Sequence, residues 1–132
     1  MKIKKEIYEE MISWMKENIP IEACGILVGR NDTVDEFIKM ENIAKSEKFF
    51  EMDPLEVMKV FEDIDNRSKE VVGIFHSHPV SDPYPSVTDL ERNEVIDHLI
   101  FVISSMRTGK PELKAFTINN KTVKEVEVEI ID

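Results

Sequence analysis

Two histidines at the end of an apolar run are the residues of this chain best suited to bind a metal. His76 and His78 follow residues 71–75, whose length and β-branched composition predict a buried strand. Side chains two positions apart on a strand point to the same face, so the two imidazoles can share one ion. A catalytic zinc site typically has three protein ligands and one open position for water. The pair therefore predicts part of such a site, with one protein ligand still to be found.

Asp89 is the nearest good candidate for the third ligand. Three prolines stiffen the loop that follows His78. Ser86 can cap a short helix whose third position is Asp89, which places this carboxylate on a rigid helix start. The loop can then fold back so that the carboxylate reaches the two imidazoles.

Each of these features also has a plainer interpretation. A single histidine at a strand end is typically a solvated polar residue, and Ser86 with Asp89, taken alone, forms a capping box. The combination favours a metal site, because same-face imidazoles, a stiffened loop and a helix-start carboxylate occur together.

The spacing of these residues resembles the signature of a known family, the JAMM/MPN+ zinc metalloproteases. In that signature His-x-His is followed by seven residues, a serine, two residues and an aspartate, as in residues 76–89 here. The family, which includes deubiquitinating isopeptidases and small archaeal relatives, also has a glutamate just before a Cys-Gly-hydrophobic-Gly segment. Residues 22–29, Glu-Ala-Cys-Gly-Ile-Leu-Val-Gly, resemble that segment.

The resemblance implies a role for each matching residue. One zinc ion (Zn2+) per chain would be held by His76, His78 and Asp89. Glu22 would act as general base and then as proton donor to the leaving amine. Ser86 would donate a hydrogen bond to the oxyanion, although the same hydroxyl can instead serve only as the helix cap, and the sequence leaves this choice open.

The resemblance also implies a reaction and a substrate class. The expected reaction is hydrolysis of the amide bond after the C-terminal diglycine of a ubiquitin-like small modifier protein, conjugated to a lysine or extended at its C-terminus. Processing of a sulfur-carrier protein is an alternative with the same chemistry, and a non-catalytic MPN scaffold or binding module is an alternative of another class. The diglycine tail would add as a strand to a sheet edge, which relatives provide in the segment that corresponds to residues 47–52. Phe49 and Phe50 are the candidate substrate-binding residues there, and packing in the core is the alternative role for either ring.

Composition limits the other classes of function. With 132 residues, 42% of them hydrophobic and 33% charged, the chain is expected to form one domain, residues 1–132. The net charge of −10 disfavours a nucleic-acid partner, because phosphate binding needs a basic face. The single cysteine, Cys24, excludes an intrachain disulfide and a cysteine-rich zinc site, and we expect it to be a buried hydrophobe. Neither a membrane-spanning run nor a signal peptide is visible, so a cytoplasmic location without a membrane partner is expected, and a homodimer is compatible with the sequence.

The elements that must position these residues can be read from apolar spacing and turn residues. Helices are predicted over residues 3–18, 54–67 and 87–96. Strands are predicted over residues 23–29, 33–40, 48–52, 71–75, 98–104, 112–118 and 121–131, with tight turns at 31–32 and 119–120. His98, the remaining histidine, falls at a strand start and is expected to face solvent. Together these elements predict an α/β or α+β fold with a mixed β-sheet of about six strands flanked by helices, and the resemblance narrows it to the cytidine-deaminase-like α-β-α sandwich of MPN (JAMM) domains.

Overall fold

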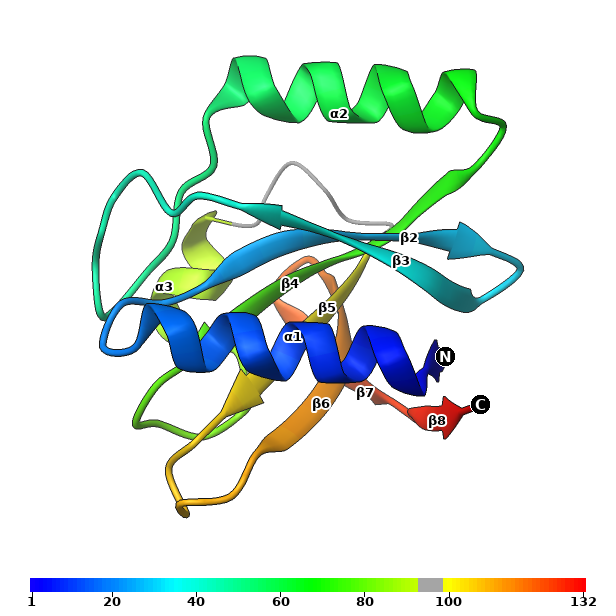
Figure 1. The fold of residues 1–132 in the computed structure, drawn as a ribbon. Coiled ribbons are helices and arrows are strands. Elements are labelled where there is room, and N and C mark those ends of the chain that lie inside the picture. The colour runs from blue at the N-terminus through cyan, green and yellow to red at the C-terminus, as the bar shows by residue number, and fades with distance from the viewer. Residues whose placement is uncertain (93–98) are drawn as a thin grey trace.

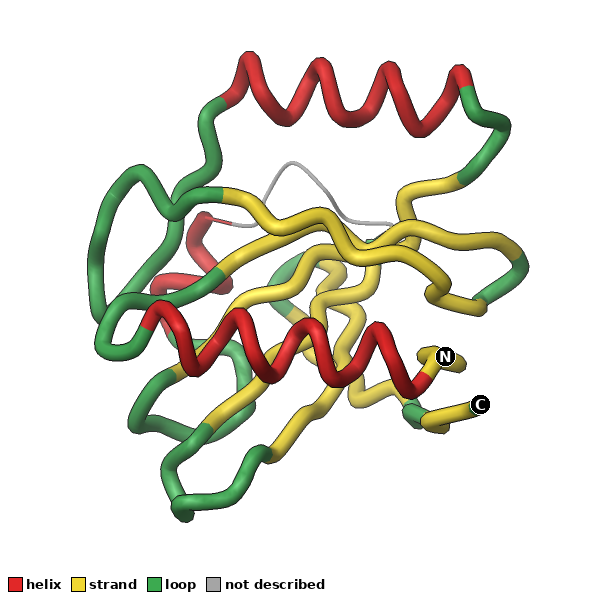
Figure 2. Tube along the Cα trace, in the orientation of Figure 1, coloured by secondary structure: helices red, strands yellow, loops and turns green. Residues whose placement is uncertain are grey.

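A strongly curved mixed β-sheet with helices on both faces forms the centre of the molecule (Figures 1 and 2). The computed structural model describes residues 1–92 and 99–132, and within them eight strands follow the order β7-β6-β5-β4-β2-β3-β1-β8. The strands are β1 Lys2–Lys4, β2 Cys24–Arg30, β3 Thr33–Met40, β4 Glu70–His78, β5 Ile100–Ser105, β6 Glu112–Asn119, β7 Thr122–Val126 and β8 Glu129–Ile131. The helices are α1 Lys5–Asn18, α2 Pro54–Asn66 and α3 Val87–Arg92. The predicted fold class, a mixed sheet flanked by helices, is confirmed.

The three central strands, β2, β4 and β5, are apolar on both faces because both faces are covered. Successive side chains of a strand point to opposite faces. Leu27 and Phe75 therefore pack in the cluster that contains the buried side chains of α1, whereas Ile26 and Ile74 pack in the cluster that contains Ile64 of α2. In Figure 1 the two long helices accordingly lie on different sides of β2 and β4. This double cover holds β4, the strand with both histidines, in the interior of the sheet.

Two tight turns close hairpins beside this core. Asn31 and Asp32 have φ angles of 50° and 67°, the left-handed conformation that a two-residue hairpin loop requires and that asparagine and aspartate tolerate. This predicted turn is confirmed. The second turn uses Asn120 and Lys121, with φ angles of 50° and 63°, one residue later than predicted, because Asn119 is still paired with Thr122 in the ladder between β6 and β7.

The sheet has more strands than the six that the sequence predicted. Residues 2–4 form β1 instead of the first helical turn, and α1 begins at Lys5. Ile3 fits the helical spacing, but as a strand residue it is equally well buried, and β1 gains parallel pairing with β3 and β8. The predicted strand over 121–131 is divided into β7 and β8, which lie at opposite ends of the strand order.

The strand predicted over residues 48–52 is wrong. Residues 41–53, all of them described, contain neither a helix nor a strand. Here the carbonyl of Phe49 and the N–H of Glu51 bond the side chain of Asn42 instead of a neighbouring strand. The loop ends as predicted, with Asp53 capping α2 by accepting a hydrogen bond from the N–H of Leu55 (2.9 Å).

Helix α3 is described as far as Arg92. The rest of the helix predicted to residue 96, together with His98 and its expected exposure, lies outside the described residues. None of the described helices is both long and apolar enough to cross a membrane.

Candidate active site

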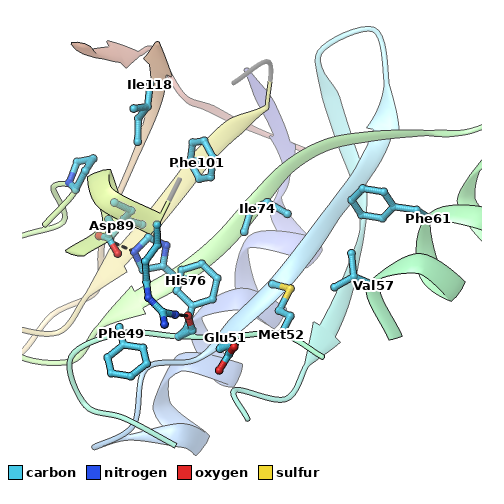
Figure 3. A pocket seen from close by; sticks show the side chains of 14 residues that line it. Phe49, Glu51, Met52, Val57, Phe61, Ile74, His76, Asp89, Phe101 and Ile118 are labelled. Carbon is cyan, nitrogen blue, oxygen red and sulfur yellow. Dashed lines mark hydrogen bonds and ion pairs between the residues drawn. The ribbon is translucent and has the colours of Figure 1, made fainter. Parts of the chain in front are cut away.

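The side chains of His76, His78 and Asp89 converge where the end of β4 meets the start of α3. The two Nε2 atoms are 3.2 Å apart, and they lie 3.1 and 3.0 Å from Oδ2 of Asp89. All three residues are buried, and Figure 3 shows His76 and Asp89 pointing toward each other. Ligand atoms around a tetrahedral zinc ion with bonds of about 2.0–2.1 Å are about 3.3 Å apart. Two imidazole nitrogens and one carboxylate oxygen at these separations fit a divalent zinc ion by both spacing and chemistry.

Hydrogen bonds fix the orientation of His78 at this site. Its Nδ1 lies 2.6 Å from the carbonyl oxygen of Asp82, which can only accept, so Nδ1 carries the proton and donates it. The other ring nitrogen, Nε2, faces Asp89 at 3.0 Å and is the atom that would bind a metal once it has lost its proton. A second hydrogen-bonded ring nitrogen of this kind is the usual support of a metal-binding histidine.

Asp89 is held by the capping box that the sequence predicted. The N–H of Ser86 donates to Oδ2 of Asp89 (2.9 Å), and the N–H of Asp89 donates to Oγ of Ser86 (3.0 Å). In the cap the hydroxyl of Ser86 acts as an acceptor, so it keeps its own hydrogen to donate elsewhere. The cap therefore leaves this hydroxyl able to donate a hydrogen bond, so the two roles between which the sequence left a choice are compatible.

Glu22 approaches the same point from the segment just before β2. Its carboxylate and the three other ligand atoms all lie within 4.8 Å of one another. The side chain is only 3% exposed, and its Oε1 has no hydrogen-bond partner among the described residues. Burial raises the pKa of Glu22 to about 8, with the positive charge of His78 opposing and the negative charge of Asp89 adding to the rise. A buried carboxylate without a partner, next to three candidate ligands, is suited to bind a proton or a water at the site.

The electrostatics of the three candidate ligands keep the aspartate charged. Burial alone would raise the pKa of Asp89, but the charge and hydrogen bond of His76 and the hydrogen bonds of His78 and Ser86 hold it well below its usual range. Burial lowers the pKa of His76, which favours the neutral imidazole that a metal requires. Burial acts in the same direction on His78, but hydrogen bonds to Asp89 and to the carbonyl of Asp82 outweigh it and raise the pKa.

An apolar pocket of about 270 Å³ opens beside His76 and Asp89 (Figure 3). Phe50 stacks on the imidazole of His76, with ring centroids 4.6 Å apart and planes at 25°. Phe49 lies under the guanidinium of Arg92, whose Cζ is 4.5 Å from the ring centroid. Both phenylalanines are half-buried and line the pocket. Its other apolar lining residues are Met52, Val57, Phe61, Ile74, Pro85, Phe101, Ile103 and Ile118.

The sequence analysis did not identify two polar residues that hold this arrangement together. Ser77, between the two histidines, points to the other face of β4, where its Oγ accepts a hydrogen bond from the N–H of Ala23 (2.8 Å). Asn42 is buried and bonds the carbonyl of Glu22. Ser77 is a small polar residue between the two histidines at the end of a buried strand, and this position was a sequence signal for a structural hydrogen bond. No local pattern distinguishes Asn42, because its partners are distant in the chain.

Cys24 takes no part in the ligand cluster. It is buried, as expected, and its Sγ lies 3.6 Å from the carbonyl oxygen of Met40, to which the thiol donates. Burial, together with the charges of Glu22 and Glu41, raises the pKa of Cys24 to about 12. At neutral pH the thiol therefore stays protonated and is a poor nucleophile.

Comparison with known proteins gives a consistent picture. Residues 4–119 match a family described as prokaryotic homologs of the JAB domain. A desampylase of Pyrococcus furiosus is 36% identical over 109 residues, which cover 82% of this chain and 75% of that protein. A CysO-cysteine peptidase of Mycobacterium tuberculosis is 28% identical over 132 residues, 98% of this chain and 90% of that protein.

A solved structure supports the fold independently of close sequence similarity. The crystal structure of a JAB1/MPN domain protein from Archaeoglobus fulgidus superposes with a TM-score of 0.66, covers 100% of both chains and is 22% identical. At this identity the likeness concerns the fold, which is that of a JAB1/MPN domain.

Proposed function

Because the chain belongs to the family of prokaryotic homologs of the JAB domain, we propose that it is a zinc-dependent peptidase or isopeptidase. The bond that it hydrolyses is the amide after the C-terminal diglycine of a ubiquitin-like small modifier protein. The observation that carries this proposal is the convergence of Glu22 with His76, His78 and Asp89 within 4.8 Å. The similarity to a desampylase and to a CysO-cysteine peptidase supports a substrate of this class.

The residues that would hold the zinc ion are His76, His78 and Asp89. Zinc, when bound, supplies a Lewis acid that acidifies water and polarises a carbonyl. The chain contributes the geometry, since the carbonyl of Asp82 orients one imidazole and the capping box orients the carboxylate. Neither contact uses the ligand atom Nε2 of His78, and together they fix the orientation of the two side chains.

Glu22 is the proposed general base and general acid. Its carboxylate takes a proton from the water whose oxygen adds to the carbonyl carbon of the substrate. When the C–N bond breaks, Glu22 returns that proton to the leaving amine nitrogen, so that water and amide become a carboxylic acid and an amine. Two observations support this role: among the described residues Oε1 has no hydrogen-bond partner, and Glu22 lies close to the three candidate ligands.

Ser86 is the proposed donor to the oxyanion that forms during the attack. Its Oγ accepts from the N–H of Asp89 and retains a hydrogen for the substrate oxygen. In enzymes where a single donor of this type was removed, the loss was about 3 kcal/mol of transition-state stabilisation. The capping box fixes the position of this hydroxyl relative to the ligand Asp89.

Phe49 and Phe50 are proposed to contact the tail of the substrate. Both rings line the pocket that opens at His76, so a peptide that reaches the ligands through this pocket passes them. Val80, Tyr84 and Val87, on the loop and helix that carry Asp89, are exposed apolar residues. We take these exposed apolar side chains, which lie close in the chain to Asp89, as support for a protein as the binding partner.

The decisive experiment is a substrate panel. Zinc-loaded protein is incubated with modifier proteins that end in diglycine, each joined to a lysine side chain or to a C-terminal extension, and the products are identified by mass spectrometry. We expect cleavage after the second glycine that stops when zinc is removed and returns when it is restored. Cleavage elsewhere, or cleavage that survives complete zinc removal, would refute the proposal.

Processing of a sulfur-carrier protein is the second candidate. It is favoured by the similarity to a CysO-cysteine peptidase along 98% of this chain. In the same panel it predicts release of a C-terminal extension from the carrier without cleavage of lysine-linked conjugates. A protein that takes up no zinc and cleaves nothing would instead be the scaffold or binding module of the third hypothesis.

A further inference from the structure

Asn42 makes four hydrogen bonds, and they connect Glu22 to the loop beside the pocket. Its Nδ2 donates to the carbonyls of Glu22 and Phe49, both at 3.0 Å. Its Oδ1 accepts from the N–H groups of Ala44 (3.1 Å) and Glu51 (3.0 Å). Both hydrogens of the amide and both lone pairs of its oxygen are therefore used. Asn42 is only 5% exposed, so water cannot replace these bonds without a change in the fold.

The backbone of Glu22 depends on this loop for its position. Glu22 precedes the first residue of β2, and its N–H donates to the carbonyl of Ser46 (3.0 Å) while its carbonyl accepts from Asn42. Its chain neighbour Ala23 is held differently, by two hydrogen bonds to Ser77 of β4. The peptide groups around Glu22 thus have two anchors, one on the strand with the histidines and one on the loop.

The far end of the loop contacts the candidate ligands. Phe50 stacks on His76, and Nη1 of Arg92 in α3 donates to the carbonyl of Phe50 (3.3 Å). Asn42 holds the adjacent residues Phe49 and Glu51. A movement of this loop would therefore be transmitted to both peptide groups of Glu22, to its N–H through the carbonyl of Ser46 and to its carbonyl through the side chain of Asn42.

We propose that Asn42 is a positioning residue that sets the place of the Glu22 carboxylate relative to His76, His78 and Asp89. The inference rests on the proposed function, in which Glu22 moves the proton. Asn42 does not touch the substrate or the ligands. It acts through the peptide group of Glu22, because a shift of about 1 Å in a proton-transfer group is enough to slow a reaction about a hundredfold.

Two variants separate the donor and acceptor roles of Asn42. Asn42→Asp keeps the shape and the acceptor oxygen but loses both hydrogens that bond Glu22 and Phe49, whereas Asn42→Ala loses all four bonds. The control is Val34→Ala, which truncates a buried side chain of β3 in the cluster on the α1 side. The two Asn42 variants and the Val34→Ala control should all lower Tm, but only the control keeps the hydrogen bonds between the loop and Glu22.

We expect both Asn42 variants to bind one zinc ion with wild-type affinity, because the ligands come from β4 and α3. We expect kcat on a diglycine fusion to fall about ten- to hundredfold with KM changed less than about threefold, since the base is displaced while the pocket remains. Val34→Ala should keep kcat.

In a Glu22→Gln background, Asn42→Asp should reduce the residual rate no further. An unchanged kcat, an equal loss in Val34→Ala or a full further loss in the double variant would overturn the proposal.

Amide hydrogen exchange tests the same connection without turnover. In Asn42→Ala the amide of Glu51 loses its acceptor and the amide of Glu22 is bonded only to the loosened loop, so both should exchange faster, and in Val34→Ala they should not. If the zinc-loaded wild-type protein cleaves nothing in the panel, the proposed function fails, but this exchange experiment still tests whether Asn42 connects the loop to Glu22. Unchanged exchange at Glu22 in Asn42→Ala would refute the positioning role in either case.

Discussion

At the scale of single residues, each candidate ligand at the site is oriented by a hydrogen bond from outside the ligand set or by packing. The carbonyl of Asp82 holds His78, Ser86 holds Asp89, and the ring of Phe50 covers His76. Glu22 is the proposed proton carrier and not a ligand, and its Oε1, like Nδ1 of His76, has no hydrogen-bond partner among the described residues. The candidate metal ligands and the proposed proton carrier can be distinguished by substitution.

The first prediction concerns Glu22 and His78. Glu22→Gln should retain one zinc ion per chain and lose cleavage by a factor of about 10² to 10⁴, because the amide cannot carry the proton. His78→Ala should lose both zinc and cleavage, because a ligand is missing. Zinc content by atomic absorption and turnover on a diglycine fusion measure the two effects. Glu17→Gln, an exposed substitution on α1, is the control and should change neither.

A normal rate in Glu22→Gln would show that another group carries the proton. Retention of tightly bound zinc in His78→Ala would show that the ion binds elsewhere.

The second prediction concerns Ser86. Ser86→Ala removes both the helix cap and the oxyanion donor, so it should lower the free energy of unfolding by about 1 kcal/mol and kcat by about 10² to 10³. Ser86→Thr keeps a hydroxyl and should recover a large part of both. Urea unfolding and steady-state kinetics separate the effects. A loss of stability with unchanged kcat would leave the cap as the only role of this residue.

At the scale of elements, α2 packs on the sheet through apolar side chains of which only Ile64 is fully buried. Val57, Val60 and Phe61 are partly buried against the same cluster, and the pocket lies between α2 and the sheet. The C-terminal end of α2 is linked to β3 by an ion pair, since Nη1 of Arg67 lies 2.9 Å from Oε1 of Glu36. Lys69 lies 3.6 Å from the same oxygen. This ion pair adds a polar link to the apolar packing.

The third prediction is the pH dependence of that link. The hydrogen bond and charge of Arg67, together with those of Lys69, lower the pKa of Glu36 below its ordinary value of 4.5. A lowered folded-state pKa means that the pair stabilises the fold above pH 4.5 and loses this effect as the pH falls through the lowered pKa. Glu36→Gln should therefore have a lower Tm than wild type at pH 7, and the difference should shrink at pH values below the ordinary pKa.

Thermal scans across this pH range make the measurement. Glu62→Gln, an exposed substitution on α2, is the control and should follow wild type at every pH. A constant difference between Glu36→Gln and wild type would contradict an electrostatic origin.

At the scale of the whole molecule, the site depends on how distant segments of the chain are paired. Antiparallel pairing of β2 with β4 sets Cys24 opposite His76, which brings Glu22 to the histidines, and α3 then adds Asp89. Because the ligands come from separate segments, an ion that binds all of them should stabilise the entire fold and not one element alone.

The fourth prediction concerns removal of the metal. A zinc ion that binds the folded site and not the unfolded chain should add about 4 kcal/mol to the free energy of unfolding at a free concentration about 1,000 times Kd. A chelator should lower Tm and abolish cleavage, and added zinc should restore both. His78→Ala is the matched control and its Tm should not respond to zinc. Equal responses in both proteins would mean that the ion acts outside this site.

Features that depend on residues close in the chain were predicted from the sequence. The alternating geometry of a strand places His76 and His78 on one face, the capping box requires only residues 86–89, and the turn at 31–32 requires only two residues that tolerate a left-handed backbone. The family resemblance, now confirmed by the match over residues 4–119, narrowed the predicted α/β or α+β fold to that of MPN (JAMM) domains. It also gave the one distant residue, Glu22, that no local pattern marks.

Only the tertiary structure decided the rest, because those features depend on partners far apart in the chain. Ile3 satisfies a helical pattern and is nevertheless in a strand, because β3 and β8 offer pairing there. Residues 48–52 have the composition of a strand, but the side chain of Asn42 takes the backbone groups that a neighbouring strand would need. The sequence by itself determined which side chains can bind a metal, and long-range pairing and buried polar contacts determined where the chain brings them together.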